Sequence, residues 1–293
     1  MALTFSPVII GTMRLGAWGA NLSTSDLERY IDECVDLGLI DFDHADIYGH
    51  YTEEARFGEV LKRRPDLVTK LNITTKCSIK LVTENRPSFR LKSYDSSPEH
   101  IRKSVDQSLQ DLGIEQIELL LLHRPDSLMN PHAVAAVFEE LKAAGKVKHV
   151  GVSNYSPSQF DLLNSFTPLQ TNQVEVSLLH LNALQDGTLD QCLKLGITPT
   201  AWSPFGGGEI FFESSNPRIQ RIQKVAKELG EVHGAGVDQI LLAWIFKHPA
   251  GIVPVTGSSK ISRIKTALEA SKIQLSHEEW YMLLEASTGE EVA

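Results

Sequence analysis

Eight short apolar segments alternate with longer amphipathic segments from one end of this 293-residue chain to the other. The apolar segments lack strict alternation of apolar and polar residues, which is typical of parallel strands covered on both faces. The segments between them carry the spacing of helices that bury one face. The strand-like segments span residues 8–10, 39–42, 72–75, 117–122, 147–152, 171–176, 197–202 and 252–255. This pattern predicts a parallel sheet whose strands are joined by helices.

Two architectures accommodate eight such repeats, an open doubly wound sheet and a closed (β/α)8 barrel. An open dinucleotide-binding sheet carries G-x-G-x-x-G after its first strand, and the sequence does not contain this motif. No linker or change of composition divides the chain. We therefore expect an α/β fold, a (β/α)8 TIM barrel, as a single domain over residues 1–293. Extra length in the loops 82–97 and 204–217 falls on its C-terminal face, where barrel active sites lie.

Several helix ends are marked in the sequence. Ser97-Pro98 and Ser156-Pro157 each combine a capping hydroxyl with a proline suited to the first helical position. Gly38 follows an apolar stripe over residues 24–37 and is placed to end that helix. Ser276 and Glu279 have the spacing of a capping box, which predicts a C-terminal helix beyond the barrel.

Charge and cysteine content exclude several classes of protein. The chain has 28 Lys and Arg against 37 Asp and Glu, a formal net charge of −9, and nucleic-acid binding requires a basic footprint. Its apolar runs are too short for a membrane span, and residues 1–10 lack the basic start of a signal peptide. Cys34, Cys77 and Cys192 are widely spaced and odd in number. We expect a reduced cytoplasmic protein, with neither nucleic acid nor membrane as a partner.

Four polar side chains lie just beyond three of the predicted strands. Asp43 and Tyr48 follow the second strand, Lys76 the third and His123 the fourth. In a barrel the carboxyl ends of the strands open onto one mouth, so we expect these side chains to converge. Taken singly, each has a structural interpretation: a helix cap for Asp43, a core position for Tyr48 and a satisfied structural histidine for His123.

Together, these four residue types suit proton donation to a carbonyl oxygen. Tyrosine has an ordinary pKa near 10, too high for an efficient donor at neutral pH. A neighbouring Lys76 ammonium would lower that pKa, and Asp43 would hold the ammonium in place. His123 would orient the carbonyl by a further hydrogen bond.

The loops after the seventh and eighth strands are suited to phosphate. They read Ser203-Pro-Phe-Gly-Gly-Gly208 and Thr256-Gly-Ser-Ser-Lys260, and in barrels these two loops frequently bind phosphate groups. Glycines allow backbone amides to approach a pyrophosphate, while Lys260 and Arg263 neutralise charge. Trp202 offers an aromatic face to a nicotinamide ring. The alternative is a flexible glycine loop followed by an ordinary capped helix.

At these residues the sequence resembles the aldo-keto reductase superfamily over almost the full chain, most closely bacterial oxidoreductases that share DHADIYG. The matching stretches, in order, are IIGTMRLG, DFDHADIYG, ITTKC, IELLLLHRPD, VKHVGVSNYSP, TNQVEVS, TAWSPFGGG and VPVTGSSKISRIKTALE. The resemblance implies a barrel that binds NADP(H) without a Rossmann domain and reduces an aldehyde or ketone to an alcohol. It makes Tyr48 the proton donor, supported by Asp43, Lys76 and His123.

The resemblance also implies sites for cofactor and substrate. The nicotinamide carboxamide would be held by Ser153, Asn154 and Gln173, and the ring would stack on Trp202. The pyrophosphate would lie against Ser203, Phe205, Gly206 and Gly207, and the adenosine 2′-phosphate against Ser258, Lys260 and Arg263. An arginine at that end favours NADPH over NADH. Met13 and Trp18 fall where the first loop reaches the substrate.

Two departures from the family pattern stand out. His44 replaces the hydroxyl residue more common after the catalytic aspartate, which we expect to alter the pocket near Asp43. The hairpin that commonly closes the bottom of such barrels is expected to be truncated or missing. The barrel bottom lies opposite the site, so this second departure concerns stability more than chemistry.

Three other functions stay open at this point. One is an NADPH-sensing subunit without catalysis, and another is a Schiff-base lyase with Lys76 as its nucleophile. The third is a metal hydrolase built on Asp43, His44, Asp46 and His123, which is disfavoured because later strands offer no further histidines. We expect no metal, a small-molecule carbonyl substrate, and a monomer or weak oligomer.

Overall fold

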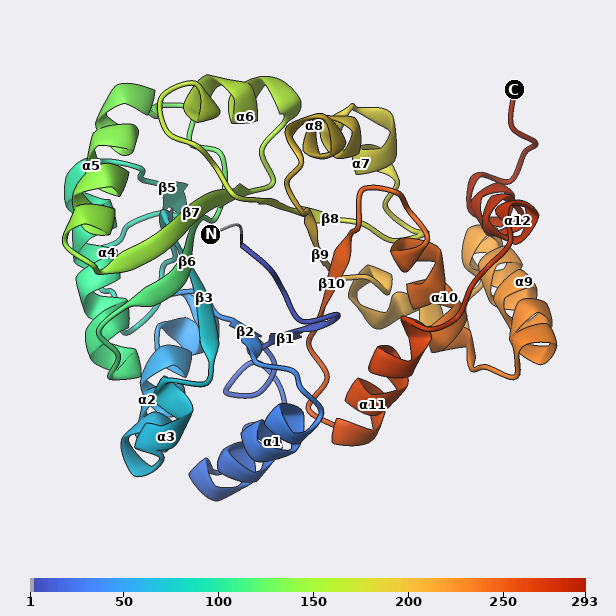
Figure 1. Ribbon diagram of the computed structural model, residues 1–293, viewed down its shortest axis with the longest axis horizontal. Helices are drawn as coiled ribbons and strands as arrows, with labels where there is room; N and C mark the ends of the chain where they lie inside the picture. Colours follow the sequence, from blue (N-terminus) through green and yellow to red (C-terminus); the bar gives the residue numbers. More distant parts are fainter. Residues whose placement is uncertain (1–2) are drawn as a thin grey trace.

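The computed structural model describes residues 3–293 and forms a closed barrel of eight parallel strands (Figure 1). Neighbouring strands are hydrogen-bonded in the circular order β1-β10-β9-β8-β7-β6-β3-β2, and β2 closes the ring on β1. The strands are β1 (Ile9–Gly11), β2 (Asp41–Asp43), β3 (Asn72–Cys77), β6 (Ile117–Leu122), β7 (Val147–Ser153), β8 (Asn172–Glu175), β9 (Thr200–Trp202) and β10 (Val253–Thr256). The predicted (β/α)8 barrel is confirmed.

Helices follow the barrel strands and form the outer ring (Figure 1). They are α1 (Thr24–Asp36), α2 (Glu53–Arg63), α3 (Pro65–Val68), α4 (Pro98–Leu112), α5 (Pro131–Ala143), α6 (Pro157–Asn164), α7 (Asn182–Gln185), α8 (Thr188–Leu195), α9 (Pro217–His233), α10 (Val237–Phe246), α11 (Ile261–Ala270) and α12 (His277–Thr288). Two short 3-10 helices, η1 (Tyr48–His50) and η2 (Gly206–Phe211), lie in loops of the C-terminal face. The C-terminal α12 packs against α9, outside the ring (Figure 1).

The helix ends marked in the sequence lie where expected. The hydroxyls of Ser97, Ser156 and Ser276 each accept a backbone N–H in the first turn of α4, α6 and α12. The capping box of α12 is complete, because the Glu279 carboxylate accepts the Ser276 N–H at 2.6 Å. Gly38 has a φ of 76° directly after α1, a conformation that favours glycine.

Two differences from the expected strands are larger than one or two residues at a strand end. The loop after β3 contains a separate antiparallel hairpin, β4 (Ile79–Lys80) with β5 (Ser93–Tyr94), which the sequence analysis missed because two-residue strands leave no periodic pattern. The seventh barrel strand begins at Thr200 rather than at residue 197. Pro199 has no N–H to donate to a strand ladder, so pairing starts after it.

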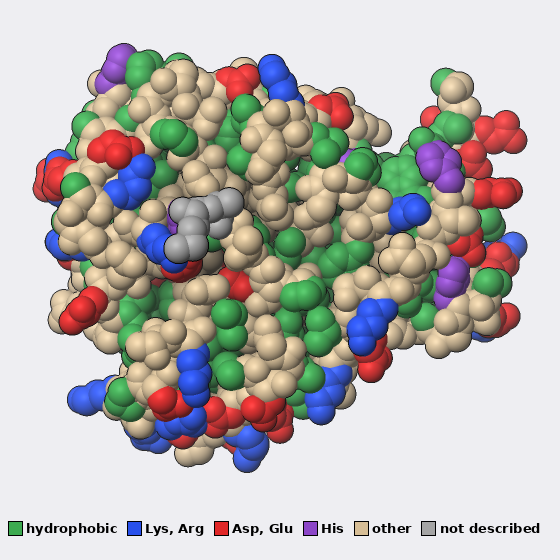
Figure 2. Space-filling model, in the orientation of Figure 1, with side chains coloured by type: hydrophobic (Ala, Val, Ile, Leu, Met, Phe, Trp, Pro, Cys, Tyr) green, Lys and Arg blue, Asp and Glu red, His purple; other side chains and the backbone are tan. Residues whose placement is uncertain are grey.

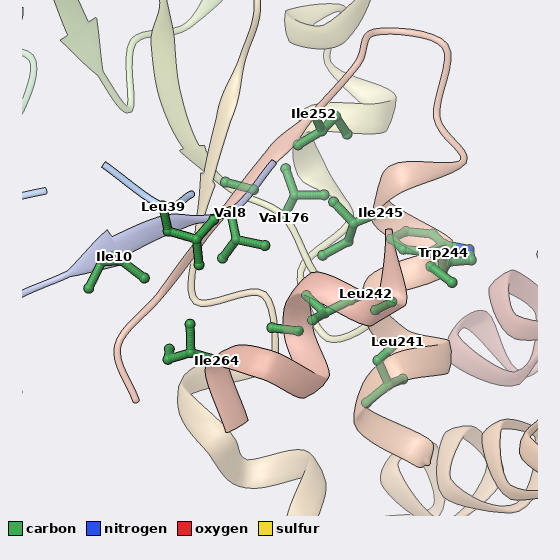
Figure 3. Packing of buried hydrophobic residues seen from close by; sticks show 14 of the residues in the cluster. Val8, Ile10, Leu39, Val176, Leu241, Leu242, Trp244, Ile245, Ile252 and Ile264 are labelled. Atoms are coloured by element: carbon green, nitrogen blue, oxygen red, sulfur yellow. The ribbon is translucent and has the colours of Figure 1, made fainter. Parts of the chain in front are cut away.

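Apolar side chains fill the layer between the barrel and its helices. Val8, Ile10 and Leu39 at the start of the barrel pack with Leu242 and Ile245 on α10 in one buried cluster (Figure 3). The cluster extends to Trp244, which stacks on Trp280 of α12 with ring centroids 5.1 Å apart. Each indole N–H of this pair donates to the other residue's carbonyl oxygen, which fixes α12 to α10.

The N-terminal end of the barrel is closed by polar contacts. Residues 3–8 contain no strand. The Asp41 carboxylate instead accepts the Ser6 N–H at 2.6 Å and the Ser6 hydroxyl at 2.5 Å. Asn72 donates to the other Asp41 oxygen at 3.1 Å. One buried carboxylate thus connects the N-terminal segment to β2 and β3.

The outer helices carry charges of both signs. Figure 2 shows Lys, Arg, Asp and Glu side chains together along the lower margin of this face, over α1, α2 and α3. Arg64 joins two of these helices, with Nη1 2.7 Å from Asp32 of α1 and Nε 2.9 Å from Asp66 of α3.

Within residues 3–293 no helix has the length and apolar character to cross a membrane.

A carboxyl group is buried between β3 and its covering helices. Glu54 of α2 accepts the Thr75 hydroxyl at 2.5 Å and the Ser108 hydroxyl at 2.8 Å. Burial raises the pKa of Glu54 to about 7, against the opposing effect of these two hydrogen bonds. A raised folded-state pKa stabilises the fold below the unfolded value of 4.5, and this stabilisation is lost as the pH rises to about 7.

We expect Glu54→Gln to remove this pH dependence, because glutamine keeps partners for both hydroxyls without ionising. Between pH 5 and pH 8 the free energy of unfolding of the wild type should fall by about 2–3 kcal/mol relative to that of the variant. Urea unfolding at the two pH values measures the difference. The exposed Glu115→Gln is the control and should show no gain; an equal change in both variants would contradict the assignment.

Candidate active site

A cavity of about 970 Å³ opens at the carboxyl ends of the barrel strands. Asp43 at the end of β2, Tyr48 on η1 and His123 after β6 all line it. Lys76 of β3 lies directly behind them and is buried. The structure therefore brings together all four side chains that the sequence analysis proposed for proton donation.

Lys76 connects Tyr48 to Asp43. Its Nζ donates to Asp43 Oδ2 at 2.6 Å, to the His44 carbonyl at 2.8 Å and to the Tyr48 hydroxyl at 3.2 Å. Burial by itself favours the neutral amine, but the Asp43 carboxylate and the Tyr48 hydroxyl more than offset this effect. The pKa of Lys76 is therefore raised, and the side chain is an ammonium at neutral pH.

The pKa of Tyr48 is raised rather than lowered in the protein alone. Burial raises it above the ordinary value of 10.0, and the Lys76 ammonium opposes this without cancelling it. The expected influence of Lys76 is present, but the sequence does not show how deeply the phenol is buried. Tyr48 consequently holds its proton at neutral pH, as a proton donor must before it reacts.

His123 faces Tyr48 across the mouth of the barrel. The two rings meet edge to face with centroids 6.0 Å apart. Burial, reinforced by the positive charges of Lys76 and Arg124, holds the pKa of His123 well below its ordinary value. A neutral imidazole has one N–H, which is able to donate to an oxygen in the cavity.

His44, the departure noted in the sequence, is fully buried and does not line the cavity. Its Nδ1 lies 3.1 Å from the Thr12 hydroxyl, which donates to the Asp43 carbonyl at 3.0 Å. Its ring packs edge-on against Phe57, with centroids 4.5 Å apart. Burial lowers the pKa of His44 to about 3, so it stays neutral. His44 thus supports the backbone at Asp43 from outside the pocket.

The four residues considered for a metal do not converge. Asp43 and His123 face the cavity, whereas the buried His44 and the half-buried Asp46 lie outside its lining. Among residues 3–293, no group of three or more His, Cys, Asp and Glu side chains is arranged to hold a metal ion.

A chain of hydrogen bonds extends from Asp43 to the far wall of the cavity. Gln173 Nε2 donates to Asp43 Oδ1 at 2.9 Å, and the Ser153 hydroxyl donates to the Gln173 carbonyl at 2.9 Å. Asn154 Nδ2 donates to Ser153 Oγ at 2.8 Å, and Trp202 Nε1 donates to Asn154 Oδ1 at 2.9 Å. The four residues that the resemblance assigns to the nicotinamide are therefore joined by hydrogen bonds to Asp43.

Two residues of the far wall have a positive φ, a backbone conformation that residues other than glycine rarely adopt. Asn154 and Ser203, at the ends of β7 and β9, have φ of 62° and 49°. Such positions cost about 1–3 kcal/mol each and cluster at binding sites. Gly207 and Gly208 also have positive φ, of 68° and 96°, and line the cavity with open space where a Cβ would be. The loop after β9 thus exposes backbone to the cavity.

The residues assigned to the cofactor's phosphates lie at different distances from the cavity. Ser203, Phe205, Gly207, Ser258 and Arg263 line it. Gly206 is adjacent but turned toward Leu179, and Lys260 is an exposed residue at the start of α11; neither belongs to the lining. The Ser258 carbonyl accepts the Tyr30 hydroxyl at 2.6 Å, which holds the loop after β10 against α1.

Met13 and Trp18 from the first loop line the end of the cavity near Tyr48. The Trp18 ring lies 6.1 Å from the Tyr48 ring. The sequence analysis did not assign Arg124, Ile79, Leu81, Tyr94 or Lys92, which also line the cavity. Arg124 directly follows His123, and that adjacency is the signal that identifies it in hindsight.

Comparison with known proteins agrees with this geometry. The model of the aldo/keto reductase family matches residues 7–287. The chain is 42% identical to the uncharacterized oxidoreductase YcsN of Bacillus subtilis, covering 99% of this chain and 97% of that protein. It is 38% identical to the 6-dehydroglucose reductase of Agrobacterium fabrum, again covering 99% of this chain and 97% of the relative.

The fold is also shared with a solved structure. The crystal structure of the thermostable aldo-keto reductase Tm1743 with the inhibitor epalrestat superposes with a TM-score of 0.81 and 22% sequence identity, covering 96% of this chain and 95% of that one. With a family match over nearly the whole chain and full-length oxidoreductase relatives, the protein belongs to the aldo/keto reductase family.

Proposed function

We propose that this protein reduces an aldehyde or ketone to an alcohol with NADPH, and that Tyr48 is the proton donor. The observation that carries the proposal is the arrangement of Tyr48 and a neutral His123 at the cavity, with the Lys76–Asp43 ion pair directly behind them. Two hydrogen-bond donors thus face one space in which a carbonyl oxygen fits.

The chain's residues would act on that oxygen as follows. In the bound substrate, the Tyr48 hydroxyl and the His123 N–H would donate hydrogen bonds to the carbonyl oxygen. As negative charge develops there, these bonds strengthen, which lowers the energy of the transition state more than that of the ground state. Tyr48 would then transfer its proton, and the Lys76 ammonium 3.2 Å away would stabilise the phenolate left behind. Asp43 keeps that ammonium charged and in place.

The residues that line the rest of the cavity fit a nicotinamide dinucleotide. Gln173 Oε1 accepts no hydrogen bond among residues 3–293 and is available to a carboxamide. The Trp202 ring would support the nicotinamide, backbone amides near Ser203, Gly207 and Gly208 would meet the pyrophosphate, and Arg263 would meet the 2′-phosphate. The bound cofactor supplies the hydride that is added to the carbonyl carbon.

The contacts of Lys76 disfavour the lyase alternative. Its nitrogen donates to three oxygens, is paired with a carboxylate, and does not line the cavity. A Schiff-base lysine requires a free, neutral amine. A cofactor-sensing subunit would need the same binding residues, and turnover separates it from a reductase.

We expect Tyr48→Phe to lower kcat for carbonyl reduction by about 10²–10⁴-fold, the contribution typical of a general acid. NADPH affinity should change less than twofold, because the hydroxyl is assigned to the substrate. Steady-state kinetics with an aromatic aldehyde and a fluorescence titration measure the two effects. Tyr281→Phe on α12 is the matched control; full activity in Tyr48→Phe would remove the donor role.

We expect NADPH to bind at least about tenfold more tightly than NADH, because a guanidinium near the 2′-phosphate adds charge-assisted hydrogen bonds. Binding should quench tryptophan fluorescence, since Trp202 lies in the cavity wall. Arg263→Gln should bring the two affinities within about threefold, while the exposed Arg90→Gln should leave the preference intact. Equal affinities in the wild type would contradict the NADPH assignment.

A further inference from the structure

The cavity is basic although the chain as a whole is acidic. Four cationic side chains, of Arg14, Lys92, Arg124 and Arg263, line it, against the carboxylates of Asp43 and Asp238. Asp43 is already paired with Lys76. The formal charge of the chain is −9, so this concentration of positive charge is local to the cavity. Such a field attracts anions into a cleft.

Arg124 places one of these charges beside the reacting groups. Its guanidinium carbon lies 5.3 Å from the centre of the Trp202 ring, and the residue directly follows His123. The positive charge of Arg124 opposes the rise in the pKa of Tyr48 and adds to the lowering of the pKa of His123. Among residues 3–293 its side chain has no ion pair and no hydrogen bond. Its donors are free for a ligand.

Lys92 lines the same cavity from the loop after β3, the strand that pairs with β6. It immediately precedes β5 and lines the cavity as an exposed residue. Its charge also contributes to the lowered pKa of His123. Within the described chain Lys92 has no carboxylate partner, whereas Lys80 on the paired strand β4 lies 3.5 Å from Asp95. Lys92 and Arg124 are therefore two cations of the cavity lining without a carboxylate partner in the described chain, and we refer to them as the cationic pair.

An apolar wall accompanies this cationic pair. Ile47 and Ile79 are buried in a small cluster with the Tyr48 ring, and Trp18 and Leu81 pack against that cluster. All of these side chains line the cavity. A ligand with its reactive group at Tyr48 thus meets an apolar surface as well as two unpaired cations.

We propose that the substrate is a carbonyl compound with an apolar stem and an anionic group, a carboxylate or a phosphate, and that Arg124 and Lys92 bind the anion. This inference rests on the proposed reductase function and adds the substrate class to it. The cofactor's own phosphates are assigned to the other end of the cavity, at Gly207, Ser258 and Arg263, which leaves Arg124 and Lys92 for the substrate. A neutral sugar aldehyde would leave both charges unpaired.

The test compares two aldehydes of the same shape, 4-carboxybenzaldehyde and its methyl ester. For the wild type we expect kcat/KM with NADPH to be at least about tenfold higher for the carboxylate, through charge-assisted hydrogen bonds. Raising KCl from 50 to 500 mM should reduce this ratio, since salt screens partly exposed charges. Arg124→Gln and Lys92→Gln should each lower the ratio at least threefold. The control Arg90→Gln, in the same loop as Lys92 but outside the lining, should keep it.

A second pair of aldehydes tests whether the site prefers a phosphate or a carboxylate. The pair is 4-formylphenyl phosphate and 4-methoxybenzaldehyde, and the larger of the two ratios identifies the anion that the site prefers. Ratios below threefold in both pairs would overturn the inference. So would a ratio that the Arg124 and Lys92 variants leave unchanged, or a neutral sugar aldehyde that is reduced more efficiently than either anionic compound.

A binding measurement separates this inference from the proposed reaction. Calorimetric titration of the protein with 4-carboxybenzaldehyde and with its ester, with and without NADP⁺, reports the anion preference without turnover. A preference of tenfold or more for the acid, reduced in Arg124→Gln, supports the anion site whether or not an aldehyde is reduced. If the acid binds in this way but no aldehyde is reduced, the result counts against the proposed reaction and not against the anion site. Equal affinities for the acid and the ester would overturn the anion site even in an active reductase.

Discussion

The buried ion pair between Lys76 and Asp43 is the interaction on which the rest of the site depends. Removing two charges from water costs several kcal/mol per ion unless geometry and further hydrogen bonds compensate for it. Here the ammonium has three oxygen acceptors, contributed by Asp43, the His44 backbone and Tyr48. Each acceptor is supplied by the segment from β2 to η1, so the pairing of β2 with β3 brings the ammonium and its acceptors together. The cost is met by a geometry that also positions the proposed proton donor.

The second oxygen of Asp43 extends the same network across the barrel. It accepts from Gln173, and hydrogen bonds continue through Ser153 and Asn154 to the Trp202 indole. One carboxylate therefore organises the proton-donating group on β2 and β3 and the proposed nicotinamide wall on β7, β8 and β9. This connection explains why two functions assigned to separate strands share one cavity.

The sequence predicts most of this arrangement, for a physical reason. Barrel strands are apolar runs, and polar residues at their carboxyl ends, such as Lys76 and His123, lie at or just behind the mouth of a closed barrel. The β4–β5 hairpin was missed because its pairing is tertiary, and the same holds for the orientation of Lys92 beside it. The raised pKa of Tyr48 was also missed, because it depends on burial, which a single sequence does not report. Which loop residues line the cavity depends on how the loops pack against one another, and the sequence pattern does not show this packing.

The most direct test of the account is a crystal structure of the protein with NADP⁺ and a carbonyl-mimicking ligand. The account predicts the nicotinamide against Trp202, its carboxamide in hydrogen-bond contact with Asn154 and Gln173, and the ligand oxygen between Tyr48 and His123. In that structure Lys76 should still be paired with Asp43. A nicotinamide bound away from Asn154 and Gln173, or a ligand oxygen that contacts neither Tyr48 nor His123, would contradict the account.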